Sequence, residues 1–220
     1  MCSREQNAHL PGRLFVRHRR TALSPANPLH TLNPTARLDH SRGGKTMTQL
    51  FMTHPGPLPA ELLVPLAPGL ALREATAADE KAIAETLAAS FEEEWDVARV
   101  RAEFSDAGDV PVTWLVEDEQ GVVGVASERI MPGTYPDAGY VHYVGVLDRA
   151  RGRRVGATLT ARCLQGFAER GLATAVLETD DFRVPAVVTY LRLGFVPTYR
   201  SAAEQGAWSV LLPSLFGPRV

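Results

Sequence analysis

A short run rich in arginine and glycine constrains the fold of this chain more than any other part of its sequence. The run Arg151-Gly-Arg-Arg-Val-Gly156-Ala follows the β-rich segment 140–146 and opens an apolar pattern of spacing four over residues 154–170. Glycines permit the tight turn between a strand and a helix, and the first amides of the helix carry the positive end of its dipole. The run therefore predicts an α/β fold with an anion site at this turn. A solvated basic helix start is the structural alternative.

Periodicity along the rest of the chain predicts further strands and helices in alternation. Apolar alternation indicates strands at 70–75, 112–116, 122–130, 140–146, 172–177, 195–199 and 208–212. Amphipathic spacing indicates helices at 76–91, 95–104, 154–170 and 185–193. This order is typical of a single α/β (α+β) domain over residues 69–220, with a mixed central sheet and helices on both faces.

The part of the chain before residue 69 has a different composition. Residues 1–46 hold eight of the 23 Lys and Arg but only two of the 25 acidic residues, together with four prolines. We expect 1–46 to be a disordered basic extension, or a misassigned start with translation beginning at Met47. Residues 47–68 are expected to be a Pro-rich linker.

Charge and cysteine content exclude several classes of function. Outside the basic extension the chain is acidic, so we expect a small-molecule partner and not nucleic acid, although the extension leaves open a nucleic-acid tether. The longest apolar run, 62–72, is too short for a membrane span of about 20 residues. Two cysteines make no disulfide scaffold or cysteine-based zinc site, so we expect a cytoplasmic protein without a metal.

Two motifs resemble those of the GNAT superfamily of acyl-CoA-dependent N-acyltransferases. The first family motif, Arg/Gln-x-x-Gly-x-Gly/Ala after a strand ending in Val, matches Val146, Arg151 and Gly156, with Arg154 in place of its first glycine. The second, Asn-x-x-Ala-x-x-x-Tyr-x-x-x-Gly-Phe, matches Ala186, Tyr190, Gly194 and Phe195, with Arg183 in place of Asn. Together the motifs cover roughly residues 69–200.

The resemblance implies acetyl-CoA as acyl donor. The sheet would then splay between its fourth and fifth strands, 140–146 and 172–177, to admit the pantetheine arm of the cofactor. Backbone N–H near Val146 would polarise the thioester, and the diphosphate would rest on the arginine- and glycine-rich run. The implied cofactor-binding residues are Val144, Val146, Arg151, Gly152, Arg153, Arg154, Val155, Gly156, Ala157, Arg183 and Ala186.

The same resemblance places Tyr190 where family members supply a proton to the departing thiolate. A core tyrosine is the alternative for this residue. For the base, His142 is the only histidine in the region expected to fold, and its reference pKa of about 6.5 suits a proton acceptor near neutral pH. Glu128 on the preceding strand is a second candidate, and water is a third.

The predicted function is acetyl transfer to a primary amine of a small molecule or a protein. A non-catalytic acyl-CoA sensor is the alternative, because Arg154 and Arg183 depart from the motifs. The run Phe91-Glu-Glu-Glu-Trp95-Asp is interpreted either as a pocket for a cationic amine or as a solvated helix face. The sequence does not determine the oligomeric state, but the expected strand 208–212 would offer an apolar surface to a second subunit, so a homodimer is left open.

Overall fold

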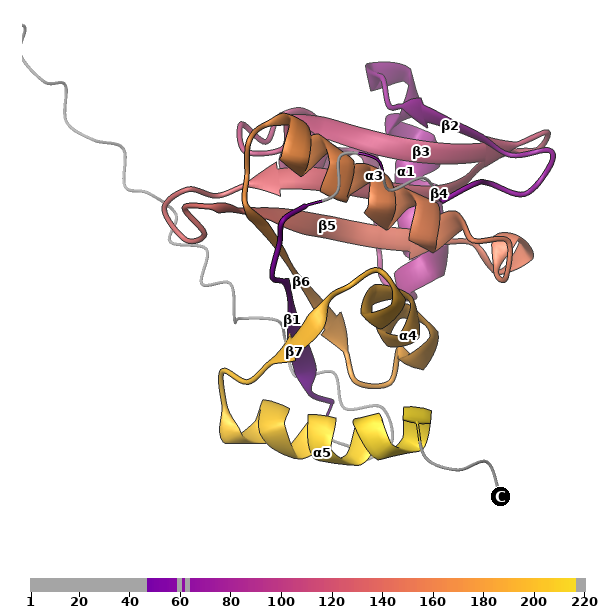
Figure 1. Ribbon diagram of the computed structural model, residues 1–220. Helices are drawn as coiled ribbons and strands as arrows, with labels where there is room; N and C mark the ends of the chain where they lie inside the picture. The colour runs from indigo at the N-terminus through magenta and orange to yellow at the C-terminus, as the bar shows by residue number, and fades with distance from the viewer. Residues whose placement is uncertain (1–46, 59–60, 62–63, 217–220) are drawn as a thin grey trace, which may run out of the picture. The chain divides into compact units, whose positions relative to one another are not determined.

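The computed structural model describes residues 47–58, 61 and 64–216 and shows a seven-stranded sheet flanked by helices (Figure 1). The strands are β1 Gln49–His54, β2 Ala71–Glu74, β3 Val112–Asp118, β4 Gly121–Ile130, β5 Ala138–Val146, β6 Thr174–Asp180 and β7 Val196–Thr198. The helices are α1 Glu80–Phe91, α2 Val97–Val100, α3 Val155–Glu169, α4 Val184–Arg192 and α5 Ala202–Phe216. Short turns lie at η1 Ala77–Asp79, η2 Arg101–Ser105 and η3 Asp148–Ala150.

The sheet is mixed, as the sequence predicts, and it opens at its single parallel contact. The strand order is β2-β3-β4-β5-β6-β1-β7, and every neighbouring pair is antiparallel except β5 and β6. The β5–β6 ladder consists of three residue pairs and ends at Tyr140 and Val176. Beyond that pair the two strands are no longer bonded to each other. Counted from β2, these are the fourth and fifth strands along the chain, where the splay was predicted.

Helices cover both faces of the sheet, which the sequence also predicts. The α3 helix packs on β3, β4 and β5, and α1 packs on β4 and β5 from the other side (Figure 1). The predicted spacing of four on α3 is confirmed, because Val155, Leu159, Cys163 and Phe167 are all buried against the sheet. A separate apolar cluster, with Leu87 and Phe104 among its members, lies under α1 and α2.

The expectation of a linker over residues 47–68 is wrong for its first part, which forms β1. This strand pairs with β6 on one side and β7 on the other, and Leu50 and Met52 are fully buried. The strand also brings His54 into the fold, so His142 is not the only histidine there. Six residues beside a proline-rich stretch are too few for a compositional reading to recognise as a strand. Residues 1–46 lie outside the described residues.

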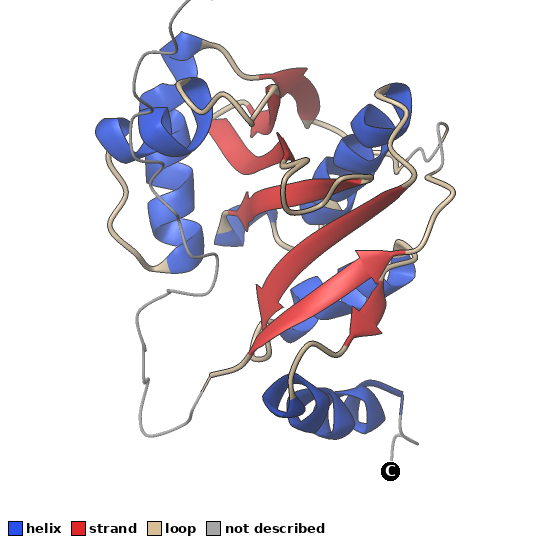
Figure 2. Cartoon of the chain, turned by 90° about the vertical axis from the view of Figure 1, so that its left-hand side faces the viewer, coloured by secondary structure: helices blue, strands red, loops and turns tan. Residues whose placement is uncertain are grey.

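The predicted strand at 208–212 is also wrong, because this segment belongs to α5. Trp208 and Leu211 are buried at helical spacing, while Val210 between them is 75% exposed. The α5 helix contacts β1 and lies beside β6, β1 and β7 (Figure 2). The indole of Trp208 thus belongs to the core of this domain and not to a surface for a second subunit. None of the helices in the described ranges has the length and apolarity that crossing a bilayer requires.

Candidate active site

The candidate site begins where the pairing of β5 with β6 ends. Beyond Tyr140 no residue pair joins β5 to β6, so this edge of β5 faces the splay between the two strands. The β4–β5 register shifts between Val125 and Ser127, and Tyr143 adopts a left-handed backbone with φ 47°. This bulge leaves Val144 and Val146 packed on the α3 side of the sheet.

The first turn of α3 lies against the end of this free strand. A Cβ placed on Gly156 would approach the side chain of Val146 to 3.6 Å and that of Val144 to 3.9 Å. The amides of Val155, Gly156 and Ala157 have no partner within the helix, and the N-cap residue Arg154 supplies no side-chain acceptor. Unpaired amides at the positive end of a 15-residue helix suit a phosphate group. The chemistry of this donor set therefore fits the diphosphate of coenzyme A.

The arginines of the run do not all converge on that turn. Arg151 forms an ion pair with Asp148 at 2.8 Å, and Arg153 donates to the Pro68 carbonyl at 3.0 Å. Arg154 is exposed, and Gly152 takes a positive φ of 76°. A cavity of about 230 Å³ lies between this loop and residues 65–67. The backbone of the loop is thus placed for an anion, whereas two of its guanidinium groups are engaged elsewhere.

Arg154 explains why the family motif has glycine at this position. Its φ of 63° lies in the left-handed region, which costs a non-glycine residue about 1 kcal/mol or more. We expect Arg154→Gly to raise the free energy of unfolding by roughly 1 kcal/mol, as measured by urea denaturation. Arg151→Gly, at an ordinary φ of −61°, is the control and should not stabilise the protein. Equal stability of Arg154→Gly and wild type would contradict the strain.

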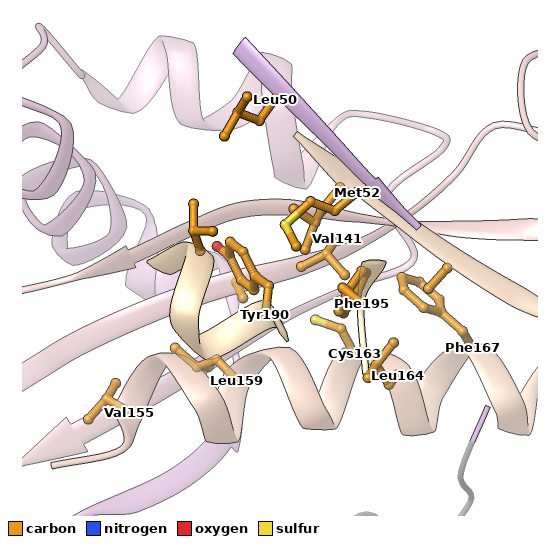
Figure 3. Packing of buried hydrophobic residues seen from close by; sticks show 14 of the residues in the cluster. Leu50, Met52, Val141, Val155, Leu159, Cys163, Leu164, Phe167, Tyr190 and Phe195 are labelled. Atoms are coloured by element: carbon orange, nitrogen blue, oxygen red, sulfur yellow. The ribbon is translucent and has the colours of Figure 1, made fainter. Parts of the chain in front are cut away.

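Tyr190 lies on α4 on the α3 side of the sheet, inside the larger apolar cluster. Its side chain packs near Cys163 and Phe195, and its hydroxyl points away from both (Figure 3). The residue is 6% exposed. Burial raises the pKa of the Tyr190 phenol above its ordinary value of 10. The phenol is therefore protonated at neutral pH and able to act as a proton donor.

His142 lies on the opposite face of the sheet, within a cluster of charges that sequence reasoning missed. Its Nε2 is 3.4 Å from a guanidinium nitrogen of Arg129 and 3.8 Å from a carboxylate oxygen of Glu103. Arg129 also binds Asp109 at 2.8 Å, and the Phe104 ring covers the imidazole with centroids 5.4 Å apart. No motif links these residues, which lie on η2, β4 and the loop before β3.

Glu128, the second candidate base, lies away from His142. Its neighbour Ser127 pairs with His142, so the alternation of β4 directs Glu128 to the α3 face. There it is fully buried beneath Gly166 and accepts hydrogen bonds from Trp114 at 2.9 Å and Arg170 at 3.2 Å. Burial raises the pKa of this carboxyl. Glu128 is thus held in the core beneath α3, with its carboxylate bonded to a side chain of β3 and to the C-cap residue of α3.

The remaining predicted residues lie on the β6 side of the splay, at the end of α1 or in the loop that follows α1. Arg183 is the N-cap residue of α4, and Ala186 lies in the first turn of that helix, partly buried. Phe91 and Trp95 pack on Tyr143, with ring centroids 5.8 Å and 4.9 Å apart, and the Glu93 carboxylate binds Arg99. Within the described residues no group of three or more metal-ligating side chains gathers.

A mixed sheet splayed at a parallel pair, with an uncapped helix N-terminus at the open end, is the arrangement that the sequence motifs predict for the class of acyl-CoA-dependent acyltransferases. A family model described as "Acetyltransferase (GNAT) family" matches residues 80–195. The chain belongs to this family.

Individual relatives agree with the assignment. A mycothiol acetyltransferase of Nocardia farcinica is 34% identical over 110 residues, which are 49% of this chain and 36% of the relative. One from Pseudarthrobacter chlorophenolicus is 36% identical over 112 residues, 50% of this chain and 31% of the relative. The chain thus spans about a third of the length of these curated relatives. A GCN5-related N-acetyltransferase structure from Sphaerobacter thermophilus matches with a TM-score of 0.56 and 21% identity, covering 68% of this chain and 48% of that one.

Proposed function

We propose that this protein transfers an acetyl group from acetyl-CoA to the primary amine of a small molecule. The observation that carries the proposal is the splay of β5 from β6 beyond Tyr140, together with the uncapped N-terminus of α3 that follows β5 and η3. A small acceptor, and not a protein amine, is favoured because the matching relatives are named for mycothiol. The acceptor would approach from the face of the sheet that carries His142.

Each part of the proposed site has a distinct task. Amides of residues 155–157 would hold the diphosphate, and the backbone of β5 beyond its last pair with β6 would hold the pantetheine arm in the manner of a strand. Bound acetyl-CoA supplies the activated acetyl group as a thioester. A backbone N–H near Val146 would stabilise the negative charge that develops on the carbonyl oxygen.

Proton transfer is divided between the two faces of the sheet. His142 would accept the proton that the attacking nitrogen loses, directly or through water, and Glu103 beside it would stabilise the resulting positive charge. Tyr190 would donate the proton that the leaving sulfur needs. The C–N bond forms and the C–S bond breaks, so an amide and a free thiol are the products.

Calorimetry with coenzyme A and a thiol-release assay together test the proposal. We expect coenzyme A to bind at low salt, and acetyl-CoA to yield free thiol only when a suitable amine is present. The amine panel includes polyamines, amino sugars, amino acids and a lysine peptide. Binding without thiol release for every amine would support the acyl-CoA sensor instead, and absence of coenzyme A binding would overturn both.

His142→Gln should lower kcat/KM for the amine about 100-fold near neutral pH, the lower end of the contribution of a general base. Because a histidine base works only when neutral, the wild-type rate should rise with pH. That rise should be absent in the variant. His54→Gln, the matched control in β1, should retain it. A pH–rate profile unchanged in His142→Gln would transfer the role to water.

A further inference from the structure

The side chain of Arg183 spans the splay between β5 and β6 at its open end, which is the end farthest from the last residue pair of the two strands. The last β5–β6 pair is Tyr140 with Val176, so Gly145 and Asp181 each lie five residues beyond it. Arg183 follows two residues later, as the N-cap of α4. Arg183 therefore lies on the β6 side of the splay, at its open end.

The contacts of Arg183 reach across to the β5 side. Its Nε donates to Asp180 at 2.9 Å, and Nη1 donates to the Ser90 carbonyl at 3.3 Å. Its guanidinium also lies 4.6 Å from the centroid of the Phe91 ring. Ser90 and Phe91 form the last turn of α1, which in Figure 1 ends close to α4.

That last turn of α1 packs directly on the part of β5 that lies beyond its last pair with β6. A Cβ on Gly145 would lie 3.0 Å from Leu87 and 3.2 Å from the Ser90 hydroxyl. The Ser90 Oγ is buried and has no hydrogen-bond partner among the described residues. An unpaired hydroxyl beside the strand edge that would receive pantetheine is a place where a polar ligand group gains a partner.

We propose that Arg183 is a positioning residue that closes the cofactor channel at its open end, on the α1 side. This inference rests on the proposed function. The Arg183 bridge, defined by Arg183 with Asp180, Ser90 and Phe91, joins α4 to α1 across the splay and holds the α1 turn over the bound pantetheine arm. Cofactor can enter or leave only when the bridge opens, so the bridge slows association and dissociation alike.

The test measures coenzyme A association and dissociation by stopped flow in Arg183→Met. We expect kon and koff both to rise, koff about tenfold, since the variant loses two hydrogen bonds and the cation–π contacts with Phe91 and Phe182. Arg183→Lys keeps the charge but not the planar fork, and its rates should fall between wild type and Arg183→Met. Arg192→Met, an exposed change on the same helix, is the control and should leave both rates unchanged.

A second variant removes the partner and keeps the arginine. Phe91→Leu should raise both rates in the same direction by a smaller factor, with thermal denaturation confirming that the domain is folded. Wild-type rates in Arg183→Met would overturn the bridge. A lower kon with a higher koff would also overturn it, because that result identifies a direct contact with a cofactor anion. If wild type binds no coenzyme A, the proposed function fails. If wild type binds coenzyme A and the variants have the same kon and koff as wild type, the bridge alone fails.

Discussion

Tyr190→Phe is expected to lower kcat for acetyl transfer by about 100-fold or more, with little change in the KM for acetyl-CoA. The substitution removes one oxygen and keeps the ring that packs near Cys163 and Phe195. Burial raises the pKa of the phenol, so the wild-type residue is protonated at neutral pH and, in the proposed mechanism, gives its proton to the leaving thiolate. Steady-state kinetics with thiol detection, at saturating amine, measures the effect.

The matched control for this prediction is Tyr199→Phe, the same chemical change at a side chain that is 54% exposed. This variant should have wild-type kcat and KM. Thermal denaturation should show that both variants are folded. Unchanged turnover in Tyr190→Phe would remove the residue from the mechanism and leave it as part of the core.

Trp208→Ala is expected to lower the free energy of unfolding by about 3–5 kcal/mol, the usual cost of emptying a large buried site. Trp208 is fully buried against the core that includes Leu50 and Met52 of β1. Losing this indole therefore weakens the contact of α5 with β1, the strand that lies between β6 and β7. Urea denaturation gives the change, provided that the variant still shows a cooperative transition.

Two neighbouring substitutions distinguish a helix from a strand at this segment. In a helix, Leu211 shares the buried side of Trp208, and Val210 faces solvent. Leu211→Ala should therefore destabilise the protein by roughly 2–4 kcal/mol, while Val210→Ala should change stability by less than about 0.5 kcal/mol. The opposite order would restore the strand that alternation predicts, since residues 208 and 210 would then share a face.

The proposed acid and base lie on opposite faces of one sheet, and in the proposal the splay lets both reach the same thioester. Tyr190 belongs to the α3 and α4 side, whereas His142 belongs to the α1 and α2 side. A continuous sheet would separate them completely. Because β5 and β6 part after Tyr140, a thioester held between the two strands would be open to both faces.

Much of the site could be predicted from local sequence, because its parts are local structures. The turn before α3 needs glycines and a helix start within a few residues, so Gly152 and Gly156 reveal it. The core face of α3 follows from a spacing of four, and the α4 motif places Tyr190 in register with Gly194 and Phe195. Secondary-structure period and turn chemistry depend only on near neighbours along the chain.

What tertiary structure alone decided involves residues far apart in sequence. The face taken by Glu128 depends on pairing with β3 and β5, and the charges around His142 come from η2, β4 and the loop before β3. The place of β1 in the sheet depends on β6 and β7, which lie more than 100 residues later in the chain and pair with its two edges. The α5 helix likewise forms where alternation suggested a strand, because burying Trp208 and Leu211 together outweighs local preference. Such contacts join segments that are far apart along the chain. Local sequence therefore predicted most of the elements, whereas tertiary contacts decided β1, α5 and the neighbours of every strand.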